Sequence, residues 1–269
     1  MANVISSSNK AKIAKRVVEV LDYFDDNHRE ATVMDIVRRY NRPQSSTSEL
    51  LSSLVELGLL YKDPYSRSYS LSPRAALLGS NGQTGIVRDG RIVRLLDRLS
   101  AQTGLGVALF GMVGLNTQIV SFRSGSRPVN ARARNVFGGM QEPLLHSAVG
   151  WLMLSTIAQP RGDGVIRRLI AEASEDRKVP FGEMAQRIQR CRELGAGVGP
   201  AGFGSGADCV AMLLPGQPID HPLAVGFVYG PDAQIDPNLL VACIEDAIAH
   251  CLRDDEAPQL FIEPLPTAA

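Results

Sequence analysis

Cysteine, tryptophan and other aromatic residues are scarce in this sequence of 269 residues. It has one tryptophan, aromatic residues make up 6%, and the four cysteines include no CxxC pair. So few cysteines without paired spacing are typical of a reducing compartment rather than of a disulfide-stabilised secreted scaffold. The four histidines are scattered and do not combine with the cysteines at metal-ligand spacing, so we expect no metal site.

Long apolar runs and a net charge are also missing. There is no run of about 18 uncharged apolar residues, and residues 1–30 contain no apolar core followed by a small-residue cleavage site. We therefore expect a cytoplasmic protein with neither a membrane span nor a secretory signal. Lys plus Arg and Asp plus Glu total 28 each, so composition alone gives no argument for nucleic-acid binding.

Catalytic motifs are missing as well. Residues 197–202 spell GxGxxG, but a helical pattern precedes them, whereas a dinucleotide-binding loop follows a strand and begins a helix. We interpret the segment as a flexible loop. No GxSxG nucleophile motif occurs either. The sequence therefore predicts a protein that is not an enzyme and needs no cofactor.

The N-terminal part does contain the pattern of a small helical domain. Thr32 and Asp35 approximate a capping box, Pro43 is well placed at the start of a helix, and Gly58 is a suitable stop. Apolar residues recur at helical spacing between these signals, and a polar turn follows. The pattern predicts three helices and a hairpin, which is a winged helix-turn-helix: helices at 10–26, 33–40 and 43–57, and strands at 59–61 and 68–71.

The rest of the chain alternates between strand and helix patterns. Residues 79–85 carry neither charge nor a large apolar side chain, so we interpret them as a hinge. A linker helix is expected next, at 87–102. The remainder predicts an α+β domain with a helix-covered sheet: strands at 107–113, 117–124, 208–214 and 223–229, and helices at 144–157, 165–174, 183–194 and 237–252.

Several of these segments resemble the IclR family of transcriptional regulators. The run from Pro43 to Leu60 resembles the family's recognition helix, and Tyr69–Arg74 resembles its wing. Residues 143–154, 208–211 and 226–231 resemble parts of its effector domain. The resemblance implies an N-terminal winged helix-turn-helix, joined by a linker helix to a C-terminal α+β (GAF-like) effector-binding domain. The expected boundaries are 1–78 for the DNA-binding domain, 79–102 for the hinge and linker helix, and 103–262 for the effector domain.

A recognition helix presents its N-terminal residues to the DNA major groove. Short hydrogen-bonding side chains stand at that end here, arginines flank the turn before it, and another arginine is at the wing. We therefore expect DNA contacts from Arg38, Arg39, Arg42, Gln44, Ser45, Ser46, Thr47, Ser48 and Arg67. For each single residue, helix capping or plain solvation is the alternative interpretation.

One pair of residues departs from the family pattern inside that helix. Ser48-Glu49 stands where the family usually has His-Arg. A carboxylate is repelled by phosphates, although it accepts a hydrogen bond from cytosine. Three hypotheses for Glu49 remain open: it reads a base, it pairs with a nearby arginine, or it weakens DNA binding.

The resemblance also implies that a small organic effector, often a carboxylic acid, binds between the sheet and the overlying helix. Relatives that bind small acids carry serines at the positions of Phe227 and Tyr229, so the two rings favour an aromatic or otherwise apolar effector, or a pocket that has lost its ligand. For Cys209 a small buried core residue is the alternative interpretation. The effector-binding residues expected from the resemblance are Ala148, Val149, Cys209, Ala211, Phe227 and Tyr229.

The predicted function follows from these observations together. We expect a sequence-specific DNA-binding transcriptional regulator that is controlled by a small organic effector, an aromatic or other carboxylic acid. Its expected partners are double-stranded operator DNA, that effector, and further copies of the chain in a homodimer or homotetramer. The alternative is a ligand-binding or scaffold protein of the same fold in which DNA binding is weakened or lost.

Overall fold

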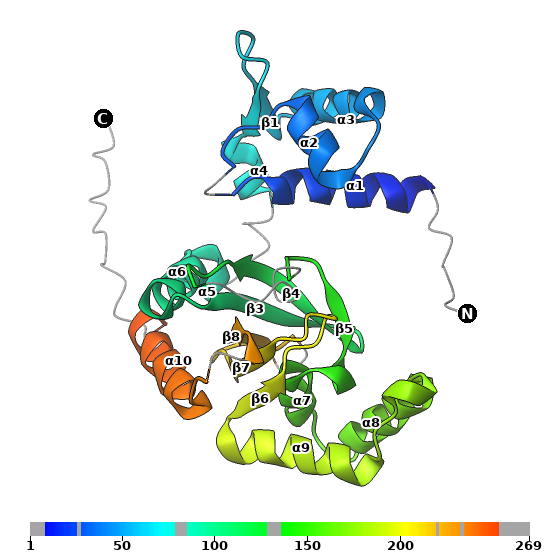
Figure 1. Ribbon diagram of the computed structural model, residues 1–269, viewed down its shortest axis with the longest axis vertical. Coiled ribbons are helices and arrows are strands. Elements are labelled where there is room, and N and C mark those ends of the chain that lie inside the picture. The colour runs from blue at the N-terminus through cyan, green and yellow to red at the C-terminus, as the bar shows by residue number, and fades with distance from the viewer. Residues whose placement is uncertain are drawn as a thin grey trace, which may run out of the picture. The chain divides into compact units, whose positions relative to one another are not determined.

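The computed structural model divides into two compact units, Met1–Arg88 and Asp89–Ala269 (Figure 1). It describes residues 9–25, 28–78, 85–127, 136–218, 221–231 and 234–252, with the side chains of residues 9–11 left out. Most of the predicted hinge at 79–85, and the predicted end of the effector domain at 262, therefore lie outside the described residues. Each unit has a hydrophobic core of its own.

The N-terminal unit is a winged helix-turn-helix, as predicted. Its core takes Val20, Ile36, Leu51, Leu54 and Tyr69 from the three helices and the hairpin, all of them buried. A short helix that the sequence did not predict follows the wing. In chain order the elements are α1 (Asn9–Tyr23), α2 (Val33–Tyr40), α3 (Gln44–Glu56), β1 (Leu60–Lys62), β2 (Tyr69–Leu71) and α4 (Pro73–Leu77).

Local sequence signals determine the turn between α2 and α3. The Asp35 carboxylate accepts hydrogen bonds from the backbone N–H and the hydroxyl of Thr32, at 2.8 and 2.7 Å, which confirms the start of α2. The helix ends at Asn41, whose left-handed backbone (φ 50°) is a common helix ending. Pro43 then leads into α3 with an extended backbone. The predicted helix at 43–57 is slightly too long: α3 ends at Glu56, and Leu57 is 61% exposed.

The C-terminal unit is built on one antiparallel sheet in the order β5-β4-β3-β8-β7-β6. Both faces of the sheet are covered. Val107 and Ala108 are successive residues of one strand and so point to opposite faces, and both are fully buried. The strands are β3 (Gly106–Val113), β4 (Asn116–Arg123), β5 (Gln141–Pro143), β6 (Ala196–Pro200), β7 (Asp208–Leu213) and β8 (Leu223–Tyr229).

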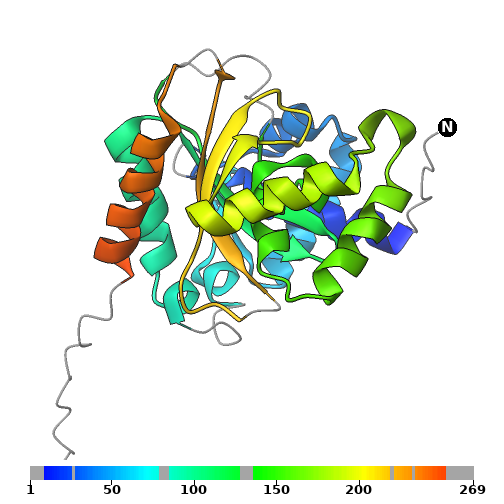
Figure 2. The ribbon, with the colours of Figure 1, turned by 90° about the horizontal axis from the view of Figure 1, so that it is seen from below.

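Helices cover both faces of this sheet, which gives the α+β architecture that the sequence predicted (Figure 2). One face packs against α6 (Arg91–Thr103) and α10 (Pro237–Cys251). The other packs against α7 (Ala148–Ser155), with α8 (Arg161–Glu172) and α9 (Phe181–Leu194) beside it. The C-terminal unit also has two short 3-10 helices, η3 (Leu144–His146) and η4 (Glu175–Arg177). A short helix, α5 (Gly85–Arg88), ends the N-terminal unit.

Two predicted elements differ from the structure. The single linker helix expected at 87–102 is divided at Gly90, whose left-handed backbone (φ 76°) separates α5 from α6. The segment interpreted as a flexible loop contains strand β6, paired with β7. Its glycines permit close packing: a Cβ on Gly197 would lie 2.5 Å from the carbonyl oxygen of Ala148. Glycine-rich sequence here marks a strand that a helix approaches closely.

Candidate nucleic-acid interface and effector site

The start of helix α3 presents a polar face to solvent. Thr47, Leu51 and Leu54 are its buried residues, and they recur at helical spacing along one side. Gln44, Ser45 and Glu49 are exposed and Ser48 is half-exposed. The predicted recognition helix therefore offers the side chains of Gln44, Ser45 and Ser48, together with the unexpected carboxylate of Glu49.

Two of the predicted DNA contacts are used inside the domain instead. Thr47 is 1% exposed and its hydroxyl donates to the carbonyl of Pro43 at 2.9 Å. The Ser46 hydroxyl donates to the same carbonyl at 3.3 Å and accepts from Arg16 at 3.2 Å. Arg16 also donates to the Ser46 carbonyl at 2.8 Å. The two hydroxyls stabilise the first turn of α3, because a short polar side chain readily bonds to the backbone of its own helix. Arg16 joins this turn to α1.

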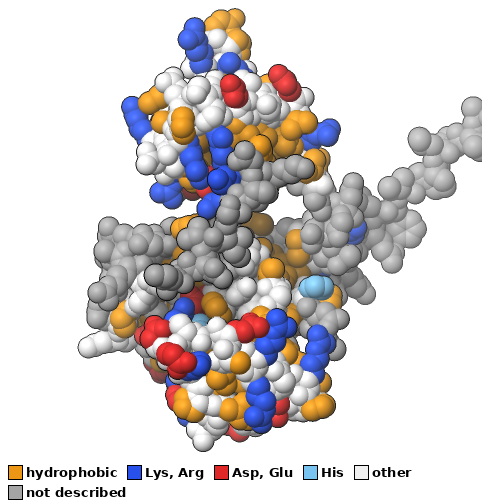
Figure 3. All heavy atoms as spheres, turned by 90° about the vertical axis from the view of Figure 1, so that its right-hand side faces the viewer, with side chains coloured by type: hydrophobic (Ala, Val, Ile, Leu, Met, Phe, Trp, Pro, Cys, Tyr) orange, Lys and Arg blue, Asp and Glu red, His pale blue; other side chains and the backbone are white. Residues whose placement is uncertain are grey.

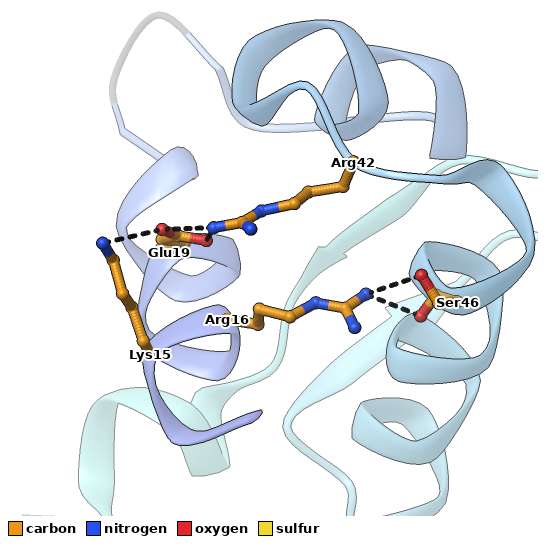
Figure 4. A network of polar contacts seen from close by, with 5 residues as sticks. All are labelled: Lys15, Arg16, Glu19, Arg42 and Ser46. Carbon is orange, nitrogen blue, oxygen red and sulfur yellow. Dashed lines mark hydrogen bonds and ion pairs between the residues drawn. The ribbon is translucent and has the colours of Figure 1, made fainter. Parts of the chain in front are cut away.

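Arg42 is likewise a structural residue in this geometry. Its guanidinium donates to both carboxylate oxygens of Glu19 at 3.1 Å, while Lys15 approaches the same carboxylate at 3.8 Å (Figure 4). The Arg42 and Glu19 side chains are 38% and 18% exposed. Arg42 therefore has a structural role that competes with the predicted DNA contact, because it joins the turn between α2 and α3 to α1. Sequence alone did not show this pair, because its members are 23 residues apart.

The other predicted basic contacts are open to solvent. Arg38 and Arg39 occupy the last turn of α2 and are exposed, as is Arg67 in the wing. Glu49 makes no ion pair within the described part of the chain, so the hypothesis that an arginine neutralises it in the free protein finds no support. The N-terminal unit accordingly exposes three of the predicted arginine contacts and one carboxylate on α3.

The six predicted effector-binding residues are divided between opposite faces of the sheet. Ala148, Val149, Cys209 and Ala211 belong to the core under α7 and are fully buried. Phe227 and Tyr229 are outside that core, although Val228 between them is in it. Successive side chains of a strand point to opposite faces.

The β7–β8 register leads to the same conclusion. Cys209 pairs with Val228, and Val210 pairs with Phe227. Phe227 and Tyr229 therefore face α6 and α10, and their predicted place beside Cys209 is wrong. Sequence reasoning located both strands but had no information on which alternate residues shared the α7 face.

The contact between α7 and strand β6 is tightly packed, since a Cβ on Gly199 would lie 3.1 Å from the Trp151 ring. Within the sheet, a Cβ on Gly226 of β8 would lie 2.6 Å from the Cβ of Ala211, its partner on β7. The indole of Trp151 donates to the Leu145 carbonyl at 2.7 Å. Burial raises the pKa of the Cys209 thiol to about 12, so it stays protonated. These features fit the alternative interpretation of Cys209 as a small core residue.

A polar cluster on the same face of the sheet was not found from the sequence. The Glu142 carboxylate accepts a hydrogen bond from the Phe203 N–H at 2.9 Å, and its other oxygen accepts one from the Arg177 guanidinium. Phe203 stacks on Phe110, with ring centroids 6.3 Å apart. Thr117 lies opposite Glu142 in the β4–β5 register. We call Thr117, Glu142, Arg177 and Phe203 the Glu142 cluster.

Two properties make the Glu142 cluster chemically unusual. The Thr117 hydroxyl is fully buried, yet it has no hydrogen-bond partner among the described residues. Such groups are rare because burial removes their water without replacing it. His146 lies close by, and burial, reinforced by the Arg177 cation, lowers the pKa of its imidazole. No sequence signal predicted this cluster, since its members come from four separate segments.

Comparisons with known proteins agree with these two units. Residues 14–64 match the family model of the IclR helix-turn-helix domain. The structure is similar to an IclR transcriptional regulator from Alicyclobacillus acidocaldarius, with 20% identity, a TM-score of 0.58, and 91% of this chain and 98% of that chain covered. No curated protein matches the sequence. Within the described residues, no helix is long and apolar enough to span a membrane.

Two further solved structures show the same fold. One is an IclR homologue from Microbacterium hydrocarbonoxydans in complex with 4-hydroxybenzoate, with 16% identity, a TM-score of 0.57, and 90% of this chain and 98% of that chain covered. The other is the effector domain of IclR from Acinetobacter sp. ADP1, with 20% identity and a TM-score of 0.55. This match covers 62% of the present chain and 96% of the Acinetobacter chain.

The helix-turn-helix domain and the fold predicted from the sequence are confirmed. The N-terminal unit contains an IclR helix-turn-helix domain, and the chain as a whole has the fold of IclR-family transcriptional regulators. This class consists of DNA-binding regulators and not of enzymes, as the sequence predicted.

Proposed function

We propose that this protein binds a specific operator sequence through α3 and that a small organic effector bound by the C-terminal domain controls this binding. The observation that carries the first part is the division of polar groups on α3. Ser46 and Thr47 are hydrogen-bonded internally, whereas Gln44, Ser45 and Ser48 remain available to base edges. Residues 1–78 would bind DNA, residues 79–102 would couple the domains, and residues 103–262 would bind the effector.

A regulator of this kind is expected to act as a homodimer or homotetramer. Two-fold symmetry in the protein would then be matched by an inverted repeat, with half-sites separated by about one helical turn, roughly 10 base pairs, or a multiple of it. The test is in-vitro selection of fragments from the source genome with the purified full chain at about 0.1–0.2 M salt, where non-specific contacts are weakened. An enriched inverted repeat would support the proposal. Absence of enrichment, with and without candidate effectors, would contradict it.

The DNA contacts have a separate test in the salt dependence of binding. Each phosphate contact that a cation makes contributes about 0.9 to the slope of log K against log salt. Replacing both Arg38 and Arg39 by alanine should therefore reduce the slope by about 1.8 per subunit. Arg168→Ala is the matched control, because Arg168 is an exposed arginine on α8 that pairs with Glu172. An unchanged slope in the double variant would remove α2 from the interface.

The effector proposal is an aromatic or other carboxylic acid. The Glu142 cluster supports it, together with Phe110. Arg177 is a cation half open to solvent beside Glu142, and the Thr117 hydroxyl has no partner among the described residues. The stacked rings of Phe110 and Phe203 lie on the same face of the sheet, the one that α7 covers. Polar groups within an aromatic environment suit a ligand with a ring and an acid group. The similar structure from Microbacterium hydrocarbonoxydans holds 4-hydroxybenzoate, a ligand of this class.

Thermal unfolding gives a direct measurement of effector binding. A ligand that binds only the folded state stabilises it by about 2.7 kcal/mol at a concentration of 100 Kd. The chain should be melted with 4-hydroxybenzoate, benzoate and acetate in parallel. A rise in Tm with the aromatic acids but not with acetate supports the aromatic class. A rise with none of them, at millimolar concentration, contradicts the proposal that small carboxylic acids bind.

A scaffold or ligand-binding role with lost DNA binding is the second candidate, and Glu49 favours it. This exposed carboxylate lies on the same side of α3 as Ser45 and Ser48 and makes no ion pair in the described structure. Glu49→Gln keeps the size of the side chain and removes its charge. Tighter binding of every DNA duplex by this variant would show that Glu49 repels phosphate. Loss of preference among duplexes would show that Glu49 reads a base.

A further inference from the structure

The wing ends in a tyrosine that contacts almost nothing in the protein. Tyr65 is 95% exposed, the highest value among the exposed large apolar and aromatic side chains in the described residues. It stands in the turn between β1 and β2, the hairpin that forms the uppermost end of the N-terminal unit in Figures 1 and 3. Basic and hydrophobic side chains meet at this end in Figure 3. A ring held so completely in water does not stabilise its own fold.

The turn that holds Tyr65 is well ordered by hydrogen bonds. The Asp63 carboxylate accepts from the N–H groups of Tyr65 and Ser66 at 2.7 and 3.4 Å, and these bonds lower the pKa of that carboxyl. The Arg67 N–H donates to the Asp63 carbonyl at 3.0 Å, and Arg67 has a left-handed backbone (φ 58°). The local backbone therefore presents Tyr65 and Arg67 from a single closed turn.

The base of the hairpin is joined to the helical part of the domain. Ala31 and Tyr69 exchange two backbone hydrogen bonds, of 2.9 and 2.7 Å, which form an isolated antiparallel bridge beside the wing. The Ser68 hydroxyl donates to Glu30 at 2.9 Å. Because Glu30 and Ala31 directly precede α2, the wing is attached to the helix-turn-helix itself. Its tip is positioned with respect to α3 before any partner binds.

The chemistry of the tip suits a sugar–phosphate surface. Tyrosine combines an apolar ring with a hydroxyl that donates to phosphate oxygens, and it is among the side chains that contact the DNA backbone. Lys62 and Arg67 supply positive charge on either side of the turn. The one carboxylate in the turn, Asp63, accepts hydrogen bonds from the backbone of the turn itself.

We propose that Tyr65 is a DNA-contacting residue, whose ring packs on a deoxyribose at the edge of the minor groove flanking the α3 site and whose hydroxyl donates to a phosphate. This inference rests on the proposed DNA-binding function. It adds a contact that is uncharged, so its contribution to affinity does not depend on counterion release. Arg67, two residues away, contributes through charge instead.

Fluorescence anisotropy with a duplex that carries the selected inverted repeat tests this inference. An aromatic ring that stacks on a base contributes about tenfold or more to affinity, and the lower end applies to a ring on a deoxyribose. Tyr65→Ala should therefore raise Kd about tenfold while leaving the salt slope unchanged, and Tyr65→Phe should raise it about threefold through loss of the hydroxyl alone. Arg67→Ala should lower the slope by about 0.9 per subunit. Because Tyr65 touches so little, the Tm of Tyr65→Ala should equal that of the parent protein.

Hydroxyl-radical footprinting locates the contact. The parent protein should protect deoxyriboses flanking each half-site, and Tyr65→Ala should lose protection there and nowhere else. Tyr61→Ala is the matched control, since Tyr61 is 58% exposed on β1 of the same hairpin. Equal losses in the two variants would indicate general damage to the wing and overturn the proposal.

The remaining outcomes separate this inference from the proposed function. If the parent protein binds the duplex and Tyr65→Ala binds it equally well, the Tyr65 contact is refuted and DNA binding stands. If Tyr65→Ala keeps parental affinity but fails to regulate transcription in a reconstituted reaction, the ring contacts a protein partner and the proposal is again refuted. If the parent binds no selected duplex, the proposed function and the Tyr65 contact fail together.

Discussion

The ion pair between Glu142 and Arg177 is expected to be asymmetric, in that losing one partner costs more than losing the other. The Glu142 side chain is 9% exposed, whereas that of Arg177 is 46% exposed. The carboxylate is thus removed from water and depends on two donors, Arg177 and the Phe203 N–H. Arg177 has the alternative of turning into solvent. Replacing Arg177 therefore leaves a buried carboxylate without its counter-ion, whereas replacing Glu142 leaves an arginine that water can solvate.

The expected magnitudes follow from that difference. Removing one partner of a fully buried pair costs about 3–5 kcal/mol, because the other charge is left uncompensated. Arg177→Met keeps the apolar stem but leaves the Glu142 carboxylate with one donor, and partial access to water lowers the cost to about 2–3 kcal/mol. Glu142→Gln keeps an acceptor for the Phe203 N–H and frees an arginine that water solvates, so it should cost about 1 kcal/mol. The double variant should cost less than Arg177→Met alone.

Urea denaturation followed by tryptophan fluorescence is the suitable assay. The chain contains one tryptophan, Trp151, which is 7% exposed in the same unit, so its emission reports on the unfolding of that unit. Arg168→Ala is the control for a surface pair and should change stability by less than about 0.5 kcal/mol. A cost for Glu142→Gln equal to or larger than that for Arg177→Met would refute the reasoning from exposure.

Three further outcomes are expected from the structure. Thr117→Val should raise the urea midpoint by the equivalent of about 1 kcal/mol, because it removes a buried hydroxyl that has no partner in the described residues; a fall in the midpoint would mean that the hydroxyl is satisfied in solution. Phe227→Ser should destabilise the C-terminal unit without changing the order of preference among carboxylic acids in the thermal assay, because Phe227 faces α6 and α10; an altered preference would contradict that orientation. Hydrogen bonds from Thr32 lower the pKa of Asp35. The carboxylate should therefore stabilise α2 above the unfolded-state pKa, near 4, and lose this effect as the pH falls through the lower folded-state value. Asp35→Asn should flatten the acid limb of a circular dichroism titration, and an unchanged limb would show that this carboxyl does not contribute to it.

Most of the N-terminal domain could be predicted from local sequence signals. The capping box at Thr32 and Asp35, the proline before α3 and the turn before β2 are local signals, and each acts on the few residues around it. The α+β class of the remainder was also evident, because apolar periodicity distinguishes strands from helices without knowledge of their partners. The family resemblance depended on the same local segments, and the helix-turn-helix match confirms it.

What each functional side chain faces depends on long-range packing and could not be predicted from local patterns. Arg42 and Arg39 are equivalent in the sequence, but one pairs with Glu19 across 23 residues and the other is open to solvent. Phe227 and Cys209 were expected together and lie on opposite faces, because a strand's alternation leaves two choices that only the register with its neighbour resolves. The Glu142 cluster joins positions 117, 142, 177 and 203 through strand pairing and loop closure. Contacts between residues so far apart along the chain depend on the packing of the whole sheet, and no local pattern encodes them.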